Sequence, residues 1–482
     1  MGQQLSQEPT LVYYNSSSAY TDNTLSPKQD SVELLNASGI EHAENGEYNL
    51  AVNKFSAAIE LDPEYAGSYC NRGIAYFYRG EYEKAIEDYN EAIKLTLALE
   101  TPHDSNYATI YNDRGAAYGS QGEHDKAIED FTKAIALDPC NANAYNNRGL
   151  VHSENEIDIA IEDYSTAIQL APNYSSPYVN RGVAYHNKGK YDLAINDYNR
   201  AIELNPDHFV VYNNRGLAYC LKGDRDRAIK DYNKAINQKP NYAEAYYNRG
   251  AAYGIKGKTD LAIKDFDKSI KRKPDHVGAY YNRGGTYLIK HDFNQAIKDF
   301  TTVIELNPDY TEAYSHRGNA YRYKGEMEKA IADYSQVIGL KPKVAESYYT
   351  RGKAWLRIEK WEEAQRDLTA AILQGVDIAD KFHNTYGSIE AFEKKTGVKL
   401  PEGIVELLTP RQEPFEIDKE TRVALAMKYY ENEELSSGLA ARLAGVSRED
   451  FWYLMADYGL SLFGTAEDLQ EELENAHKAS HQ

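Results

Sequence analysis

Arginine and aspartate recur along this sequence of 482 residues in positions that would let them pair. Nine segments carry an arginine directly before a glycine: Arg72, Arg114, Arg148, Arg181, Arg215, Arg249, Arg283, Arg317 and Arg351. The same nine carry an aspartate directly before a later aromatic residue or leucine: Asp88, Asp130, Asp163, Asp197, Asp231, Asp265, Asp299, Asp333 and Asp367. A tenth segment has lost both, with Ser38 and Lys54 instead. Joint loss favours a structural, charge-assisted hydrogen bond within each segment. An arginine array that binds an acidic ligand is the alternative.

Asparagine forms a second set, two residues before the same glycine. Six segments carry it: Asn71, Asn147, Asn180, Asn214, Asn248 and Asn282. The others have Asp113, His316, Thr350 and Ala37. A carboxamide offers both a donor and an acceptor, so it can satisfy a peptide unit without reading a side chain. The alternative interpretation is that duplication of the segment simply copied a polar residue.

The glycines define the elements that must position these side chains. They are Gly39, Gly73, Gly115, Gly149, Gly182, Gly216, Gly250, Gly284, Gly318 and Gly352. Seven of the nine steps between them are 34 residues, and the longest step holds an insertion at about 95–106. A period of this length indicates an array of repeated supersecondary units, in which each unit buries its apolar face against its neighbours.

Each unit reads as two helices joined by a turn. On both sides of Gly250, apolar or small residues occur at helical spacing: Tyr246, Tyr253, Ala262, Phe266 and Ser269. Lys256-Gly257-Lys258 supplies a turn, and Pro274 ends the unit because proline cannot continue a helix.

These positions resemble the signature of the tetratricopeptide repeat family. The resemblance implies an all-α fold, a right-handed superhelical solenoid of ten helix pairs over residues 32–372 with a concave groove. It also implies that the asparagine position faces this groove, as in family members that grip an extended peptide by its backbone. Tyr247 and Tyr281, one residue earlier, would add apolar area on the groove wall. The family's lysine and asparagine clamp for a C-terminal carboxylate is missing from its expected positions.

The C-terminal part follows a different pattern. We expect a helical capping segment at 373–409, a linker at 410–414, a helix-turn-helix-like domain at 415–475 and a tail at 476–482. The motifs YYE, AARLAGVSREDF and EDL resemble uncharacterised protein family 0175, whose small prokaryotic members are regarded as predicted antitoxins. Arg442 and Arg448 would be the nucleic-acid contacts of such a domain. From Arg411 to Gln482, however, 7 basic residues face 15 acidic ones, which favours a packing or protein-interaction module.

Composition narrows the function further. A net charge of −20 makes nucleic acid an unlikely general partner, and three scattered cysteines give no disulfide or zinc pattern. Residues 1–31 read as a disordered polar tail without a secretory signal, although Gly2 and Ser6 match a myristoylation pattern. No long apolar run, catalytic motif, metal site or cofactor motif is present.

We therefore expect a non-enzymatic, cytoplasmic and bacterial scaffold or adaptor. It would bind a peptide or partner protein of unknown identity in the groove, with no cofactor. The alternative is a regulator in which the repeats sense a partner and the C-terminal module acts as an antitoxin or transcription factor. The sequence does not define an oligomeric state.

Overall fold

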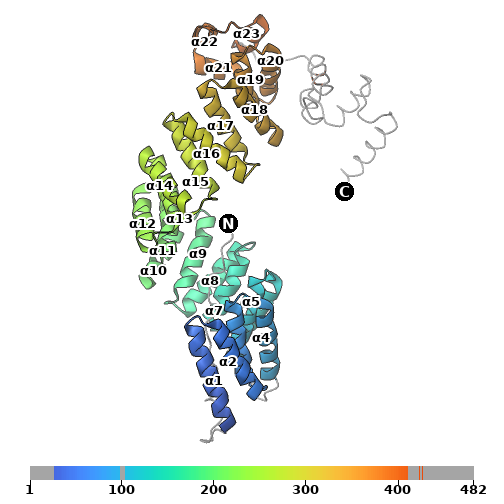
Figure 1. Cartoon of the computed structure of the whole chain (residues 1–482), viewed down its shortest axis with the longest axis vertical. Helices are drawn as coiled ribbons and strands as arrows, with labels where there is room; N and C mark the ends of the chain where they lie inside the picture. Colours follow the sequence, from blue (N-terminus) through green and yellow to red (C-terminus); the bar gives the residue numbers. More distant parts are fainter. Residues whose placement is uncertain (1–26, 98–103, 411–422, 424–425, 427–482) are drawn as a thin grey trace, which may run out of the picture. The chain divides into compact units, whose positions relative to one another are not determined.

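The computed structural model describes residues 27–97, 104–410, 423 and 426 (Figure 1). Gly2, most of the expected N-terminal tail, and the expected helix-turn-helix-like domain with Arg442 and Arg448 lie outside these residues. The first helix begins at Pro27, so residues 27–31, which we expected in the tail, are helical. The described residues form α-helices and no strands, which confirms the all-α prediction.

The chain divides into two compact units, residues 1–273 and 274–482. The described part of the first unit consists of seven helix pairs: α1 (Pro27–Glu44) with α2 (Tyr48–Leu61), α3 (Ala66–Tyr78) with α4 (Tyr82–Leu97), α5 (Asp104–Ser120) with α6 (His124–Leu137), α7 (Ala142–His152) with α8 (Ile157–Leu170), α9 (Ser175–Asn187) with α10 (Tyr191–Leu204), α11 (Phe209–Leu221) with α12 (Arg225–Gln238), and α13 (Ala243–Ile255) with α14 (Thr259–Arg272). Within the unit, each second helix also packs against the first helix of the next pair.

The second unit contains three further pairs and three short helices. The pairs are α15 (Val277–Ile289) with α16 (Phe293–Leu306), α17 (Thr311–Lys324) with α18 (Met327–Leu340), and α19 (Ala345–Arg357) with α20 (Trp361–Leu373). The short helices are α21 (Ile378–Tyr386), α22 (Ile389–Thr396) and α23 (Glu402–Leu408).

Close approach of the two helices in a pair explains the glycine period. A Cβ atom at Gly216 on α11 would lie 2.7 Å from Cε1 of Tyr232 on α12, closer than carbon atoms can approach. The Tyr232 side chain is fully buried, and Ala228 and Ala235 on the same helix are buried with it. The aromatic ring therefore occupies the space that a side chain at the glycine would fill. Nine of the ten pairs pack in this way, and in the last pair Leu368 takes the place of the ring against Gly352.

The short C-terminal helices complete the core of the last pair. Phe382 on α21, Phe392 on α22 and Leu408 on α23 are fully buried in one hydrophobic cluster with Leu356 and Leu368 of α19 and α20. The rings of Phe382 and Phe392 lie 5.3 Å apart between centroids. Exposed ends of a repeat array need such a cover because the last pair has no following neighbour. Of the helices in the described part of the chain, none is long and apolar enough to span a membrane.

Candidate functional site

The first helices of the pairs line one side of each unit. In the first unit each of the first helices from α1 to α11 contacts the next first helix, and in the second unit α15 contacts α17. Successive second helices form no contact of comparable extent among the described residues. Because the first helices approach one another more closely, their side is the concave side of each unit. We call it the first-helix face.

Asparagine side chains on this face are hydrogen-bonded from one repeat to the next. Asn180 Nδ2 donates to Asn146 Oδ1 at 3.0 Å, and Asn146 Nδ2 donates to Asn147 Oδ1 at 3.2 Å. Asn147 Nδ2 then donates to Asn112 Oδ1 at 3.0 Å, and Asn112 Nδ2 donates to Asp113 Oδ1 at 3.1 Å. This relay joins α9, α7 and α5 through five side chains, of which Asn146, Asn112 and Asp113 are buried.

The same inter-repeat bond recurs at both ends of the first unit. Asn248 Nδ2 on α13 donates to Asn213 Oδ1 on α11 at 2.9 Å, and Asn213 Nδ2 lies 3.5 Å from Asn214 Oδ1. Asn71 Nδ2 on α3 donates to Asn36 Oδ1 on α1 at 3.2 Å. In four repeats the residue three before the glycine is a buried asparagine that accepts a hydrogen bond from the asparagine of the next repeat: Asn36, Asn112, Asn146 and Asn213.

The sequence analysis did not distinguish the buried, supporting asparagines from the half-buried ones. Asn112, Asn146 and Asn213 stand beside the proposed ligand-binding asparagines in the sequence, yet they are buried and support them. The pairs Asn-Asp and Asn-Asn directly before Arg-Gly were a usable signal, because two adjacent carboxamides on a helix point in directions about 100° apart. Asn180 and Asn248 are half-buried and keep their Oδ1 atoms without a hydrogen-bond partner among the described residues.

One member of the relay is ionisable. Burial raises the pKa of Asp113 to about 7, and the hydrogen bond from Asn112 opposes this shift. The Tyr89 hydroxyl, which is electrostatically coupled to Asp113, is buried and has no hydrogen-bond partner in the described part of the chain. A protonated Asp113 is nearly isosteric with the asparagine that other repeats have at this position.

The two expected groove tyrosines are half-buried in aromatic contacts. The Tyr247 ring lies 6.1 Å from Phe266, between centroids. The Tyr281 ring lies 5.1 Å from Tyr310 and 5.5 Å from His316. Burial raises the pKa of Tyr281 and lowers that of His316, so both rings are neutral near pH 7. Asn282 follows Tyr281 on α15, and its carbonyl accepts a hydrogen bond from the Thr286 hydroxyl at 2.7 Å.

The arginine and aspartate sets meet within each repeat. In each pair Nε and Nη2 of arginine donate to the two carboxylate oxygens of aspartate. The distances are 2.8 and 2.7 Å for Arg215–Asp231, 2.6 and 2.7 Å for Arg249–Asp265, and 2.8 and 2.6 Å for Arg283–Asp299. The aspartates are buried, and only 14–18% of each of these arginine side chains is exposed. This bidentate geometry leaves little of the guanidinium groups for a ligand.

The arginines also tie each repeat to the preceding one. Nη1 of Arg215 donates to Asn199 Oδ1 at 2.7 Å, and Nη1 of Arg317 donates to Thr301 Oγ1 at 3.1 Å. Both acceptors directly follow the buried aromatic residue of the preceding second helix. A residue with a hydrogen-bonding oxygen occupies this position after every aromatic of the period, a sequence signal that we did not use.

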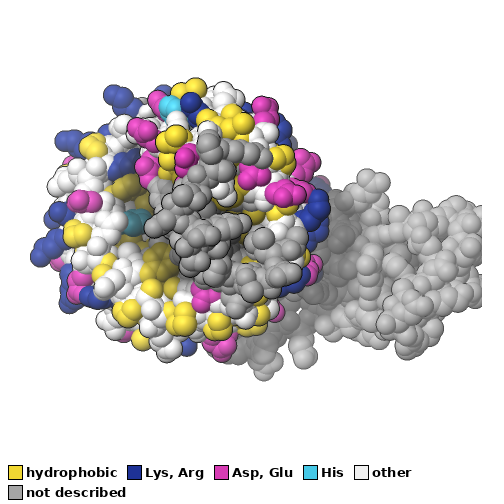
Figure 2. Space-filling view, turned by 90° about the horizontal axis from the view of Figure 1, so that it is seen from below, with side chains coloured by type: hydrophobic (Ala, Val, Ile, Leu, Met, Phe, Trp, Pro, Cys, Tyr) yellow, Lys and Arg dark blue, Asp and Glu magenta, His cyan; other side chains and the backbone are white. Residues whose placement is uncertain are grey.

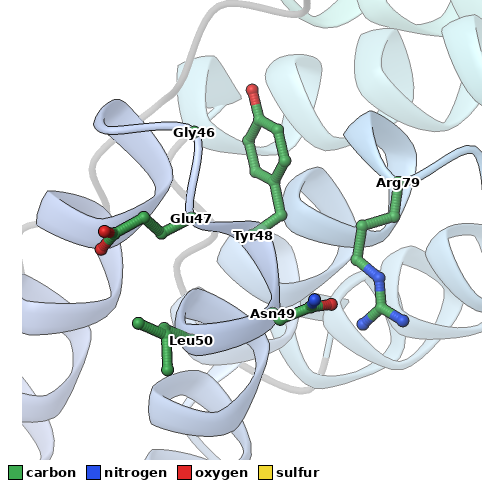
Figure 3. A pocket seen from close by; sticks show the side chains of 6 residues that line it. All are labelled: Gly46, Glu47, Tyr48, Asn49, Leu50 and Arg79. Carbon is green, nitrogen blue, oxygen red and sulfur yellow. The ribbon is translucent and has the colours of Figure 1, made fainter.

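A shallow pocket of about 290 Å³ lies at the turn between α1 and α2, beside the end of α3. Its six lining residues do not converge on a common point, because Glu47 and Leu50 point away from Asn49 and Arg79 (Figure 3). Tyr48 stacks on Tyr78 at 5.1 Å between ring centroids. No cluster of histidine, cysteine or acidic residues suited to a metal ion occurs among the described residues. In the face shown in Figure 2, basic side chains are most frequent along the left edge, and acidic and hydrophobic side chains are interspersed over the rest of the coloured surface.

Family comparisons agree with this architecture. Models of the tetratricopeptide repeat match residues 39–78, 64–139, 152–189, 176–208, 197–230, 216–254, 243–276, 277–310 and 318–358. The model of the uncharacterised protein family UPF0175 matches residues 393–478. The chain belongs to the tetratricopeptide repeat family and carries a C-terminal UPF0175 segment. The match begins within α22 and includes α23, so it extends upstream of the linker that we expected at 410–414.

Individual relatives match either part of the chain. A UPF0175 protein of Aeropyrum pernix is 38% identical over 81 residues, which are 17% of this chain and 84% of that protein. Tetratricopeptide repeat protein 36 of Xenopus tropicalis is 40% identical over 62 residues, which are 13% of this chain and 31% of that protein. The chain thus spans about a third of the latter relative.

Solved structures of similar chains include two tetratricopeptide repeat proteins. A tetratricopeptide repeat protein from Parabacteroides merdae is 21% identical, with a TM-score of 0.40, and the match covers 51% of this chain and 94% of that one. YrrB, described as a TPR protein with an unusual peptide-binding site, is 26% identical with a TM-score of 0.32. That match covers 40% of this chain and 95% of YrrB.

Proposed function

We propose that this protein is a non-enzymatic scaffold that binds an extended segment of a partner protein on the first-helix face of its repeats. One observation supports this most strongly. The half-buried carboxamides of Asn147, Asn180 and Asn248 stand at the same position of their first helices, and each donates a hydrogen bond to a buried asparagine of the preceding repeat. A side chain that is already oriented loses little rotamer entropy when it binds a ligand.

The chemistry suits a peptide backbone. Asn180 and Asn248 use one amide hydrogen in the inter-repeat bond, which leaves one hydrogen and the Oδ1 lone pairs for a ligand. A peptide unit needs one donor and one acceptor, and a carboxamide supplies both. Tyr247 and Tyr281 add apolar surface with a hydroxyl group, which supports contacts to side chains of many kinds. Such a surface would bind partners in the cytoplasm, where the chain's free cysteines stay reduced.

Affinity capture with the full chain tests this proposal. The test variant carries Asn180→Ala, Asn214→Ala and Asn248→Ala. The control variant carries Asn173→Ala, Asn187→Ala and Asn241→Ala, three exposed asparagines at the ends of helices and in turns. We expect the wild type and the control to retain the same partner proteins from a native lysate and the test variant to lose them, with helicity unchanged. Equal capture by all three would reject the first-helix face as the binding site.

A second candidate function is that of a regulator, in which the repeats control the activity of the UPF0175 segment. The observation in its favour is that the family match begins inside α22, next to Phe392, which is buried against the last repeat. Repeat and effector segment would then share one hydrophobic cluster. Arg442→Ala and Arg448→Ala in the full chain test a nucleic-acid role. Loss of binding to DNA from upstream of the chain's own gene would support it, and no binding by the wild type would reject it.

A further inference from the structure

The relay of side chains on α5, α7 and α9 ends on an acidic residue that no other repeat has at this position. Asp113 stands two residues before its glycine, where six of the other nine repeats have asparagine and three have alanine, histidine or threonine. In the preceding repeat the residue three before the glycine is Cys70, so no carboxamide continues the relay on α3. Duplication of the repeat therefore does not explain the buried Asp113 carboxyl group.

All four hydrogen bonds of the relay run in one direction. The Nδ2 atom of each asparagine donates to the side-chain oxygen of the next member at 3.0–3.2 Å, in the order Asn180, Asn146, Asn147, Asn112 and Asp113. In each bond the acceptor is the member nearer to Asp113. The relay thus has a donor end on α9 and an acceptor end on α5.

A carboxylate at the acceptor end accounts for this direction. An ionised aspartate only accepts hydrogen bonds, whereas a carboxamide has a donor on one side and an acceptor on the other. Asn112 must therefore turn its amide nitrogen toward Asp113, and its oxygen is then available to accept from Asn147. Each carboxamide is oriented in this way by the one before it, as far as Asn180. Bonds in such a chain also polarise one another, and the bond to the ionised group is the strongest.

A second relay in the first unit has the same arrangement without the charge. Asn248 Nδ2 donates to Asn213 Oδ1 at 2.9 Å, and Asn213 Nδ2 lies 3.5 Å from Oδ1 of Asn214, which occupies the position of Asp113 in its repeat. The corresponding bond from Asn112 to Asp113 is shorter, at 3.1 Å. Because a carboxamide turned by about 180° offers a donor in place of the acceptor, Asn214 does not fix the direction of its relay.

The surroundings of Asp113 make its charge responsive to pH. Burial raises the pKa of Asp113 to about 7, and of the described residues only Asn112 opposes this shift. The neighbouring titratable groups are the buried Tyr89 hydroxyl on α4, which is electrostatically coupled to Asp113, and the Cys70 thiol on α3, which is coupled to that hydroxyl. The charged residues that stand near these groups in the sequence form bidentate ion pairs with each other or with the following helix: Arg72–Asp88, Arg114–Asp130 and Arg148–Asp163.

We propose that Asp113 is a positioning residue for the ligand-binding asparagines of α7 and α9, and that its ionised carboxylate fixes the orientation in which Asn147 and Asn180 present their amide groups. The proposal rests on the proposed function and adds a control on one part of the first-helix face. Above about pH 7 a partner's peptide segment meets both asparagines in a single arrangement of donors and acceptors. Below that pH either orientation satisfies the relay. Asn248, in the second relay, is not subject to this control.

Nuclear magnetic resonance of the side-chain amides in the full chain tests the relay without any ligand. The asparagines are labelled with nitrogen-15, and signals are assigned from variants that each lack one asparagine. Between about pH 5.5 and 8.5 we expect the Nδ2 proton signals of Asn112, Asn147 and Asn180 to move downfield with a common midpoint near pH 7. The signals of Asn213 and Asn248 should stay constant. Exchange of the Asn112 amide with water, relative to Asn213, should slow by about threefold or more, the scale of a bond that becomes charge-assisted.

Two variants identify the group that titrates. Asp113→Asn keeps the shape of the side chain and should abolish the movement of the signals. Asp125→Asn, which removes an exposed carboxylate of α6, is the matched control and should leave the movement unchanged. Circular dichroism checks that both variants fold. The proposal is overturned by wild-type signals that do not move, by a movement that persists in Asp113→Asn, or by a movement confined to Asn112, which would make Asp113 a local structural residue.

The outcome is separable from that of the proposed function because the relay is observed without a partner. If the relay signals titrate but the variant with Asn180, Asn214 and Asn248 replaced retains its partners, the first-helix face is rejected as the binding site and the relay is a structural device. If that variant loses its partners and the relay signals do not titrate, the positioning role of Asp113 alone is rejected.

Discussion

Asn180 Nδ2 donates a 3.0 Å hydrogen bond to Asn146 Oδ1, so the carboxamide proposed to bind the ligand is held by a buried carboxamide of the preceding repeat. Asn146 is fully buried, whereas Asn180 is half-buried. The two asparagines thus have different roles although both lie just before the period's glycine.

Replacing the buried member should cost stability as well as binding. Asn146→Ala removes the acceptor for Asn180 and the donor for Asn147. We expect the free energy of unfolding to fall by about 1–3 kcal/mol, because buried polar groups lose their partners. Urea unfolding followed by circular dichroism measures this loss. Asn173→Ala, at an exposed turn, should change it by less than about 0.5 kcal/mol, and equal losses would show that the relay does not stabilise the fold.

Asp113 should make stability depend on pH. Its pKa is raised from about 3.9 in the unfolded chain to about 7 by burial. The native state therefore keeps its proton between these values while the unfolded state releases it, and the free energy of unfolding falls as pH rises from about 4 to 7. Asp113→Asn removes the titrating group and keeps the shape.

The gain from Asp113→Asn should accordingly grow with pH. We expect almost no difference from the wild type at pH 4 and a stabilisation on the order of 2–4 kcal/mol at pH 8. Urea unfolding of both proteins at several pH values tests this. A difference that stays constant from pH 4 to 8 would mean that the Asp113 carboxyl titrates normally in the folded protein.

The stability of the fold should depend on each arginine–aspartate pair being either intact or removed as a whole. Arg249→Ala leaves the Asp265 carboxylate, which is 4% exposed, without its bidentate partner and with only the Lys268 ammonium group at 3.9 Å. It should destabilise the first unit by about 3–5 kcal/mol. The double variant Arg249→Met and Asp265→Leu removes both charges and should recover much of this loss. Thermal unfolding of the single and double variants is the measurement. A double variant no more stable than Arg249→Ala would contradict this account.

Glu359 holds a backbone conformation that glycine adopts elsewhere. Its φ angle is +58°, and Gly325, 34 positions earlier in the preceding repeat, has a φ angle of +83°. Glu359→Gly should therefore raise the free energy of unfolding by about 0.5–1 kcal/mol, and Gly325→Glu should lower it by a similar amount. Both are measured by thermal unfolding. A Glu359→Gly variant less stable than the wild type would show that the strain is compensated by contacts of the carboxylate.

Periodicity was enough to predict the fold because the period reports packing directly. Gly216 recurs where Tyr232 needs space, so the repeat and its helix pair follow from the sequence. The joint loss of arginine and aspartate in the first repeat pointed to the pairing that the structure shows. Periodicity identifies a helix face, however, and it does not distinguish the buried Asn213 from its half-buried neighbour Asn214.

Residues that differ from the repeat pattern are not explained by the period and have to be located in the structure. Arg322 and Lys353 stand at positions where the other repeats have no lysine or arginine, so the period does not account for them. The sequence analysis also did not predict that the UPF0175 match begins at residue 393. The apolar residues of α22 and α23 pack into the core of the last repeat, so their pattern predicts a capping segment and does not reveal which family the segment belongs to.

Recognition of a peptide backbone by the first-helix asparagines is the central claim, and backbone N-methylation tests it most directly. The ligand is a peptide from a captured partner, and its Kd is measured by calorimetry for single N-methyl and single alanine derivatives. We predict that N-methylation at contacted peptide units raises the Kd by about tenfold or more, since each removes a donor to Asn180 or Asn248, whereas alanine at the same positions changes it little. Tight binding by the N-methyl series, with loss in the alanine series, would contradict the account.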